Sequence, residues 1–333
     1  GESFVYYNKG WMDTTEASNL NLKNVCIKAF TDDVASIDKS KLLQAIRECE
    51  AENLKESDYT AATWAKYLEM KQAAEALYQS AQPSEHEIVR AVINLKSARN
   101  ALKPAEVLIA DENSFVRFIK DIEAGSSYEG QTVRLRCDLD MRGVEYHILR
   151  MGQKLFQGTF DGGGHSISNL SYRYGYSYGG LFGQIGNQGV VKDLILSDVE
   201  ALELSGSFSG GIAGINEGTI RGCKVTGENL EFASSNTGGI AGSNKGTIEN
   251  CAVEGSLYFT GDTGQSGGIA GSNDGRIARS FVSGEIVFQN QTDSAHCVGG
   301  IGGFNRGTME KCYVSGEINS DSMVSIGGIA GYS

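Results

Sequence analysis

Residues 238–255 read Gly-Gly-Ile-Ala-Gly-Ser-Asn-Lys-Gly-Thr-Ile-Glu-Asn-Cys-Ala-Val-Glu-Gly, and the same pattern recurs along the chain. Its opening Gly-Gly-x-x-Gly is found again from residues 179, 210, 267, 299 and 327, with the copy at 179 degenerate in its later part. Successive copies start 28 to 32 residues apart. A fixed period of this length indicates a repeat architecture in which each unit stacks on the next.

Between its glycines, each unit alternates apolar and polar residues, as in Thr247-Ile248-Glu249. This alternation is typical of half-buried strands, and about three short strands fit into one unit. A unit of this size cannot bury its apolar face alone, so stacked copies must share one core. We therefore expect a right-handed parallel β-helix, or solenoid, with one coil per unit and about 4.8 Å between coils.

Stacking in register places equivalent residues of successive coils above one another. An inward aliphatic column is expected from Ile212, Ile240, Ile269, Ile301 and Ile329. An asparagine ladder is expected at one corner from Asn216, Asn244, Asn273 and Asn305. Cys223, Cys251 and Cys312 share an interior slot with Leu194 and Ser280. Because a serine also fits there, the slot selects small volume rather than sulfur chemistry.

A helix and further strands precede the repeats. Asn113 or Ser114 is expected to cap an amphipathic helix over residues 114–124, which ends at Gly125. Its apolar stripe would cover the open first coil, because solenoids need a cap. Residues 133–141 then alternate as a strand, and residues 156–170 read Phe-Gln-Gly-Thr-Phe-Asp-Gly-Gly-Gly-His-Ser-Ile-Ser-Asn-Leu.

The chain before residue 106 has a different composition. Of the 44 glycines in the whole chain, 42 lie after residue 105, whereas both prolines, Pro83 and Pro104, lie before residue 106. Residues 39–56, 60–81 and 84–103 carry apolar side chains at helical spacing, and Ser84 with Glu87 forms a capping box. Short loops predict an up-down-up three-helix bundle over 39–105. The β-helix would then occupy 106–333, with repeats from 179 onward, and residues 1–38 stay unassigned.

The repeat is similar to the GLUG motif, and the run at 156–170 is similar to the lead-in segment that precedes this motif in the same proteins. The resemblance covers residues 107–333. It implies a secreted or cell-surface β-helix of the kind found in surface proteins of gut bacteria and in the non-catalytic N-terminal regions of immunoglobulin A proteases. Residues 39–103, with Tyr59-Thr60-x-x-x-Trp64 entering the second helix, resemble the FIVAR-type bundles of bacterial surface proteins. That resemblance implies a spacer or a ligand-binding module.

Charge and hydropathy exclude several classes of protein. The net charge is −12, with 13 basic and 15 acidic residues before position 106 and 16 against 26 after it. This balance argues against nucleic acid as a partner.

No apolar run approaches the roughly 18–20 residues of a spanning helix. We therefore expect no transmembrane segment in this chain and place any signal or lipid anchor outside it. The seven cysteines contain no Cys-x-x-Cys pair, which favours buried free thiols over a zinc site or a disulfide framework.

Asp138, Asp140, Asp161 and His165 form the best candidate polar site. Such carboxylates could act as acid and base on a polysaccharide or could hold calcium through oxygen ligands. Alternatively, Asp161 and the following glycines form a tight turn with His165 packed beside it. The corner residue of each repeat is Asn rather than Asp, so a calcium ladder is not expected. We expect no cofactor and no bound metal.

Four tyrosines are the best candidate binding residues. Tyr172, Tyr174, Tyr176 and Tyr178 alternate just before the first repeat, and a strand would place all four on one face. Exposed tyrosines bind partners or sugars well, although burial against the neighbouring coils is the alternative. Loops at 202–208, 230–237, 256–266 and 286–297 vary in length on one side of the stack, which is often the binding face of a solenoid.

Three functions remain open at this point. The first is a non-catalytic, adhesin-like surface protein of a bacterium that binds a host glycan or glycoprotein, with immunoglobulin A as one candidate. The second is the N-terminal portion of an immunoglobulin A protease-like zinc endopeptidase whose catalytic domain, like its zinc motif, is absent from this chain. The third is a polysaccharide lyase or hydrolase on the β-helix. Because the last repeat stops before its Asn-x-Gly corner, we also expect further coils or a covering partner beyond Ser333.

Overall fold

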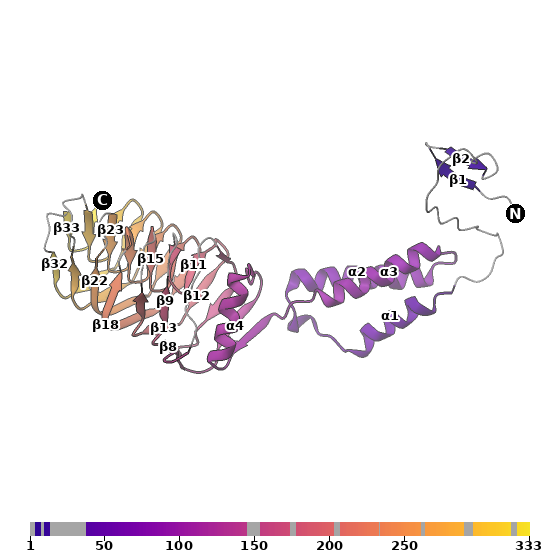
Figure 1. Cartoon of the computed structure of the whole chain (residues 1–333), viewed down its shortest axis with the longest axis horizontal. Coiled ribbons are helices and arrows are strands. Elements are labelled where there is room, and N and C mark those ends of the chain that lie inside the picture. Colours follow the sequence, from indigo (N-terminus) through magenta and orange to yellow (C-terminus); the bar gives the residue numbers. More distant parts are fainter. Residues whose placement is uncertain are drawn as a thin grey trace.

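The computed structural model describes residues 4–7, 10–13, 38–144, 154–173, 178–202, 207–232, 234–260, 264–289, 296–320 and 325–333. Near the N-terminus, β1 (Phe4–Tyr7) and β2 (Gly10–Asp13) pair as an antiparallel hairpin. Three helices follow, and then a column of stacked strands that begins beside a fourth helix (Figure 1). The chain therefore combines a helical part with a parallel β-solenoid, which confirms the predicted fold class.

The helical part consists of α1 (Ser40–Ala51), the short 3-10 helix η2 (Glu56–Asp58), α2 (Ala61–Gln79) and α3 (Glu85–Asn100). Its core is formed by Leu42, Ala45, Ile46, Cys49, Tyr67, Ala74, Ile88, Leu95 and Ala98. The Ser84 hydroxyl accepts from the Glu87 amide, and Glu87 accepts from the Ser84 amide, so the capping box starts α3. The first helix ends five residues earlier than expected, because Asn53 turns into the left-handed region with φ of 48°.

Each coil of the solenoid passes through the same sheets, which are named here by the order of passage. Sheet I contains β3 (Glu106–Ile109), β4 (Thr132–Leu135), β7 (Thr159–Asp161), β12 (Val190–Lys192), β17 (Thr219–Arg221), β21 (Thr247–Glu249), β25 (Arg276–Ala278) and β30 (Thr308–Glu310). Sheet II contains β5 (Leu139–Asp140), β8 (Ser166–Ser168), β13 (Ile195–Ser197), β18 (Lys224–Phe232), β22 (Ala252–Phe259), β26 (Phe281–Ser283) and β31 (Tyr313–Ser315). β27 (Ile286–Phe288) and β32 (Ile318–Ser320) continue sheet II beside the second half of β22, and β9 (Ser171–Arg173) pairs separately with β14 (Glu200–Leu202).

The chain then runs through two further sheets. Sheet III contains β10 (Tyr178–Gly179), β15 (Phe208–Gly210), β19 (Asn236–Gly238), β23 (Gly264–Gly267), β28 (His296–Gly299) and β33 (Ser325–Gly327). Sheet IV contains β6 (Leu155–Phe156), β11 (Phe182–Ile185), β16 (Ala213–Asn216), β20 (Ala241–Asn244), β24 (Ala270–Asn273), β29 (Gly302–Asn305) and β34 (Ala330–Tyr332). Pairing is parallel and in register, so that Ile220 lies opposite Ile248 and Asn216 opposite Asn244.

The coils contain more strands than the three that were expected. The run from Asn236 to Asn244 is split into two strands, β19 and β20, because the chain turns at Gly238 and Gly239 as it passes from one strand to the other. Segments expected as loops at 230–237, 256–266 and 286–297 also contain strand residues. Their alternate side chains Leu230, Phe232, Leu257, Phe259, Ile286 and Phe288 are buried in the core.

α4 (Glu112–Glu123) covers the first coils of the solenoid (Figure 1). It starts two residues before the predicted position, because Asp111 and not Asn113 or Ser114 is the N-cap. Asp111 Oδ1 accepts from the Ser114 amide, while Ser114 Oγ accepts from the Asp111 amide. Phe118 on the inner side of α4 packs against the aromatic rings of Tyr128, Phe156, Phe160 and Phe182.

The solenoid core is built mainly from stacked aliphatic positions. Ile212, Ile240, Ile269 and Ile301 are fully buried, whereas Ile329 in the last coil is 40% exposed. Fully burying one such side chain contributes about 2–3 kcal/mol. Close coil packing also requires glycine at some corners: a methyl group on Gly246 would lie 2.1 Å from the Gly218 carbonyl oxygen of the preceding coil.

Candidate functional site

The asparagine corner forms a continuous hydrogen-bonded row. Asn216 Nδ2 donates to Asn244 Oδ1 at 2.8 Å, Asn244 Nδ2 to Asn273 Oδ1 at 2.7 Å, and Asn273 Nδ2 to Asn305 Oδ1 at 2.7 Å. The next residue of each coil carries alternating charge, with Lys245 paired to Glu217 and Arg306 to Asp274. These contacts stabilise coil stacking, and among the described asparagines of this row only the Asn216 Oδ1 atom, at its start, is buried without a hydrogen-bond partner.

The cysteine slot is interior. Cys223, Cys251 and Ser280 are at most 1% exposed. The Cys223 thiol donates to the Arg221 carbonyl at 3.4 Å, and the Cys251 thiol donates to the Glu249 carbonyl at 3.3 Å. Burial raises the pKa of the Cys223 thiol well above its ordinary value. The Cys223 thiol is therefore protonated, and both cysteine side chains are buried, as expected of small packing groups.

Asp161 is a buried carboxylate that joins three strands of sheet I. Its Oδ2 lies 2.8 Å from an Arg134 guanidinium nitrogen and 2.7 Å from Lys192 Nζ, and its Oδ1 accepts from the Gly163 amide at 3.0 Å. Burial acts to raise the pKa of Asp161, but the hydrogen bonds from Lys192 and Gly163 and the two positive charges hold it below the ordinary value. Oδ2 is therefore occupied by contacts between coils, and Oδ1 by a local turn within its own coil.

The other members of the predicted polar cluster also have local partners. Asp138 Oδ1 accepts from the Ser166 amide at 2.8 Å and lies 3.4 Å from His165 Nδ1. Asp140 Oδ1 accepts from the Arg142 amide at 3.0 Å and from Asn169 Nδ2 at 2.7 Å. Backbone hydrogen bonds lower the pKa of both carboxyls. Across the described parts of the chain, no group of three or more His, Cys, Asp or Glu side chains is placed to hold a metal ion.

The predicted row of four tyrosines does not lie along one strand. Tyr172 is in β9 and its backbone pairs with Ala201, whereas Tyr178 is in β10 of sheet III, where its ring lies 6.0 Å from that of Phe208. Tyr174 and Tyr176 lie outside the described residues. Tyr172 and Tyr178 therefore lie in strands of different sheets and do not share one face of a single strand.

Sequence reasoning missed two aromatic pairs on the outside of the C-terminal coils. Phe281 in β26 stacks on Tyr313 in β31, with ring centroids 4.9 Å apart and planes within 2°. Phe304 in β29 stacks similarly on Tyr332 at 5.2 Å, with the Arg306 guanidinium over the Phe304 ring. Tyr313 is 54% and Tyr332 58% exposed. Aligning the repeats residue by residue would have placed each pair at one repeat position.

A buried histidine was missed as well. His296 in β28 is 2% exposed, its Nε2 lies 3.1 Å from Ser266 Oγ, and its ring packs on Phe288 at 4.1 Å. Its Nδ1 has no hydrogen-bond partner among the described residues. Burial lowers the pKa of His296 to about 4. No signal in the repeat pattern points to this position, because the equivalent residue of the preceding coil is Gly264.

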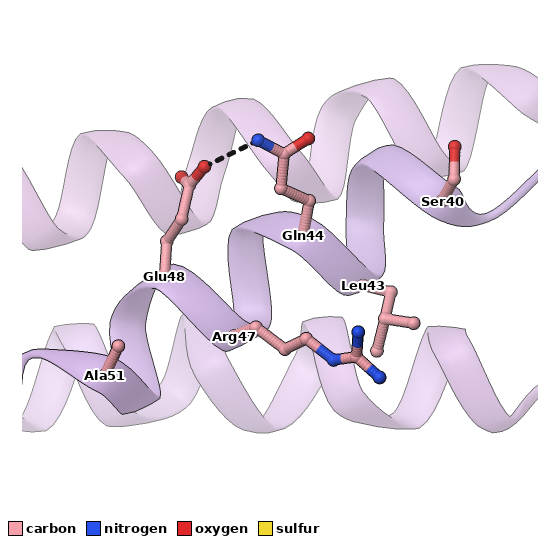
Figure 2. Close-up of a pocket in the computed structure, with 6 residues that line it drawn as sticks. All are labelled: Ser40, Leu43, Gln44, Arg47, Glu48 and Ala51. Carbon is pink, nitrogen blue, oxygen red and sulfur yellow. Dashed lines mark hydrogen bonds between the residues drawn. The ribbon is translucent and has the colours of Figure 1, made fainter.

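The helical part offers a shallow groove along α1, lined by Ser40, Leu43, Gln44, Arg47, Glu48 and Ala51 (Figure 2). Gln44 Nε2 donates to Glu48 Oε1 at 2.8 Å, so two of the polar side chains that line the groove already pair with each other. Figure 2 shows Leu43 and Arg47 pointing to the other side of the helix from this pair. The groove therefore lacks a convergent set of free polar groups.

Taken together, the fold and the corner define a parallel β-solenoid repeat protein whose coils are joined by side-chain ladders. Residues 294–319, in the fifth repeat, match the family model of the GLUG motif, so the chain carries this motif. Among the helices in the described part of the chain, none is both long and apolar enough to cross a bilayer.

Two known proteins are similar to parts of this chain. Halomucin of Haloquadratum walsbyi is 31% identical over 122 residues, which are 33% of this chain; the chain spans about 1% of the length of halomucin. A Bacteroides ovatus crystal structure, provisionally assigned as an immunoglobulin A1 protease, superposes with a TM-score of 0.47 at 18% identity. That similarity covers 68% of this chain and 84% of the other.

Proposed function

We propose that this chain is a non-catalytic binding protein of the cell surface, adhesin-like in action, whose solenoid presents an outer face to a host glycan or glycoprotein. The observation that carries the proposal is the Phe281–Tyr313 pair on the outside of sheet II, in which Tyr313 is exposed and Phe281 half-buried. Each ring is followed two residues later by a serine, Ser283 and Ser315. Aromatic rings with a polar handle, held on regular backbone, are suited to binding sugars and protein surfaces. The GLUG motif and the similarity to halomucin support an extracellular or surface location.

The rigid backbone beneath this pair favours binding over catalysis. β26 and β31 are held in register by the parallel ladder, and Val282 beneath them is fully buried. Little side-chain entropy is therefore lost when a partner contacts the stacked rings. The carboxylates that could serve polysaccharide chemistry are instead engaged with Arg134, Lys192, Ser166, Arg142 and Asn169.

Binding to an array of host glycans and to immunoglobulin A, followed by titration of the best ligand, tests this proposal. Tyr313→Ala should weaken binding by roughly tenfold, which corresponds to about 1.4 kcal/mol. Tyr258→Ala, which changes another outward tyrosine of sheet II, is the matched control and should bind like the unaltered chain. Cleavage of immunoglobulin A by this chain would overturn the non-catalytic proposal. Glycan depolymerisation lost in Asp161→Asn would overturn it in favour of a polysaccharide lyase or hydrolase.

A further inference from the structure

The corner between sheets I and II holds one residue per coil in the left-handed conformation. Going along the solenoid, this corner column consists of Asp193, Gly222, Asn250, Arg279 and Lys311, with φ between 49° and 62°. In the first four, the backbone N–H donates to a carbonyl of the next strand of sheet I, at 3.0 to 3.1 Å. The ladder therefore imposes the left-handed conformation at this corner, whatever side chain stands there.

Arg279 and Lys311 are unusual occupants of such a position. Glycine adopts positive φ without strain, and Asn and Asp tolerate it. A long side chain costs roughly 1 kcal/mol there, so backbone geometry does not explain why the last two coils carry cations. Residues kept in strained conformations by the surrounding structure are concentrated at functional sites.

The two cations have different surroundings. Arg279 is braced, because its Nη2 lies 2.6 Å from Glu249 Oε2 and its Nε donates to Asn250 Oδ1 at 2.8 Å. Lys311 is exposed, and its ammonium group forms no ion pair or hydrogen bond with any residue that the structure describes. Among the described residues of this corner, Lys311 thus carries a positive charge without a side-chain partner, beside a second cation held in place.

The aromatic pair lies directly next to these cations. Phe281 follows Arg279 by two residues, and Tyr313 follows Lys311 by two residues, with Ser280 and Cys312 turned inward between them. Neighbouring coils are about 4.8 Å apart. A cation, a tyrosine hydroxyl and ring edge, and the Ser315 hydroxyl therefore line one edge of sheet II.

We propose that this corner binds a sugar that carries a carboxylate, with Lys311 pairing the carboxylate and Tyr313 contacting the sugar ring. The inference rests on the proposed function and names the ligand class of the same surface. The whole chain, these two cations included, has a net charge of −12. An acidic ligand is therefore repelled elsewhere and attracted at this corner, and its binding weakens as salt screens the charges.

Titration with sialyllactose and with oligogalacturonate, each against its neutral counterpart lactose or oligogalactan, tests the inference. The unaltered chain should bind at least one acidic sugar at least tenfold more tightly than its neutral counterpart, and less tightly as salt is raised. Lys311→Gly should abolish this preference. It should leave the thermal unfolding midpoint unchanged or higher, because glycine adopts the same φ without strain.

Asn53→Gly is the matched control, because it replaces another left-handed residue, in the helical part, without removing a charge or a contact of the corner column. It should keep the preference for the acidic sugar. Equal binding of acidic and neutral sugars, no binding of either acidic sugar, or full binding by Lys311→Gly would overturn this inference. If this inference fails but Tyr313→Ala still weakens binding to another glycan or to a glycoprotein, the proposed function is kept without the acidic-sugar specificity. If the chain binds no glycan and no glycoprotein, the proposed function and this inference both fail.

Discussion

Single asparagine residues stabilise the corner by different amounts according to their place in the row. Asn244→Ala would leave the Asn216 amide and the Asn273 oxygen without their side-chain partners in a buried site. We expect it to lower the free energy of unfolding by roughly 2–4 kcal/mol, because unsatisfied buried groups cost more than the hydrogen bond itself contributes. Asn305→Ala removes one bond of the row, at a part-buried position, and a longer bond to the Gly307 carbonyl, and should cost about 1 kcal/mol. Urea unfolding measures the loss of unfolding free energy in each variant. Equal losses would contradict the expectation that an interior asparagine of the row contributes more than the one at its end.

His296 makes the stability of the solenoid depend on pH. Its pKa of about 4 in the folded chain lies below the ordinary value of 6.5, because burial disfavours the charged ring. The unfolded chain therefore takes up a proton first as pH falls. The stability from the neutral ring is fully present above pH 6.5 and is lost between pH 6.5 and 4, by about 3 kcal/mol.

The measurement for His296 is the unfolding free energy as a function of pH. His296→Phe should flatten its slope between pH 6.5 and 4, since the neutral ring can pack against Phe288 without titrating. His165→Asn, at a side chain that is 38% exposed, is the control and should keep the slope. A titration of the His296 ring near its ordinary value would contradict this account.

At the scale of the strand, glycine sets how closely successive coils approach. A methyl group on Gly239 would lie 2.5 Å from the Gly268 carbonyl oxygen and 2.8 Å from Val253, whereas one on Gly328, at the equivalent repeat position, would meet no atom within 4 Å. Gly239→Ala should therefore destabilise the solenoid by roughly 2–3 kcal/mol. Gly328→Ala should change its stability by less than about 0.5 kcal/mol. Thermal unfolding of the two variants compares them, and similar midpoints would refute close packing as the reason for glycine.

The elements also show what a single sequence can and cannot predict. The parallel solenoid follows from the repeat, because in-register stacking is the way in which identical apolar positions such as Ile220 and Ile248 share a core. The division of each coil into four sheets was not predictable, because the turn at Gly238-Gly239 has the same composition as the strands beside it. The start of α4 was missed because Asp111, Asn113 and Ser114 are all good N-caps, and only the hydrogen bonds select Asp111.

The candidate site was less predictable than the fold for a similar reason. Asp161 stood out because it lies beside three glycines, yet the structure uses it to join Arg134 and Lys192. Tyr313 did not stand out, because its neighbours in the same row are Phe281, Ala252 and Lys224. An exposed position that varies from coil to coil carries no periodic signal, and it becomes visible once the coils are stacked.

At the scale of the whole molecule, the helices and the solenoid have separate cores. The buried residues of the bundle and those of the solenoid form two clusters with no member in common. Contacts at the junction are polar, as between Gln131 Nε2 and the Pro104 carbonyl at 3.0 Å. Such a junction transmits little stabilisation from one core to the other, so we propose that residues 39–105 and 106–333 unfold as separate units.

Core truncations in each part test this separation. Leu95 and Ile248 are both fully buried, one in each core, and replacement of either by Ala should cost about 2–5 kcal/mol. Leu95→Ala should lower the midpoint of one calorimetric transition, and Ile248→Ala should lower the midpoint of the other. Helix content followed by circular dichroism should fall mainly in the transition that responds to Leu95→Ala, because α1, α2 and α3 lie in the bundle. One shared transition that moves with either substitution would contradict the separation and would require that the polar junction couple the two cores.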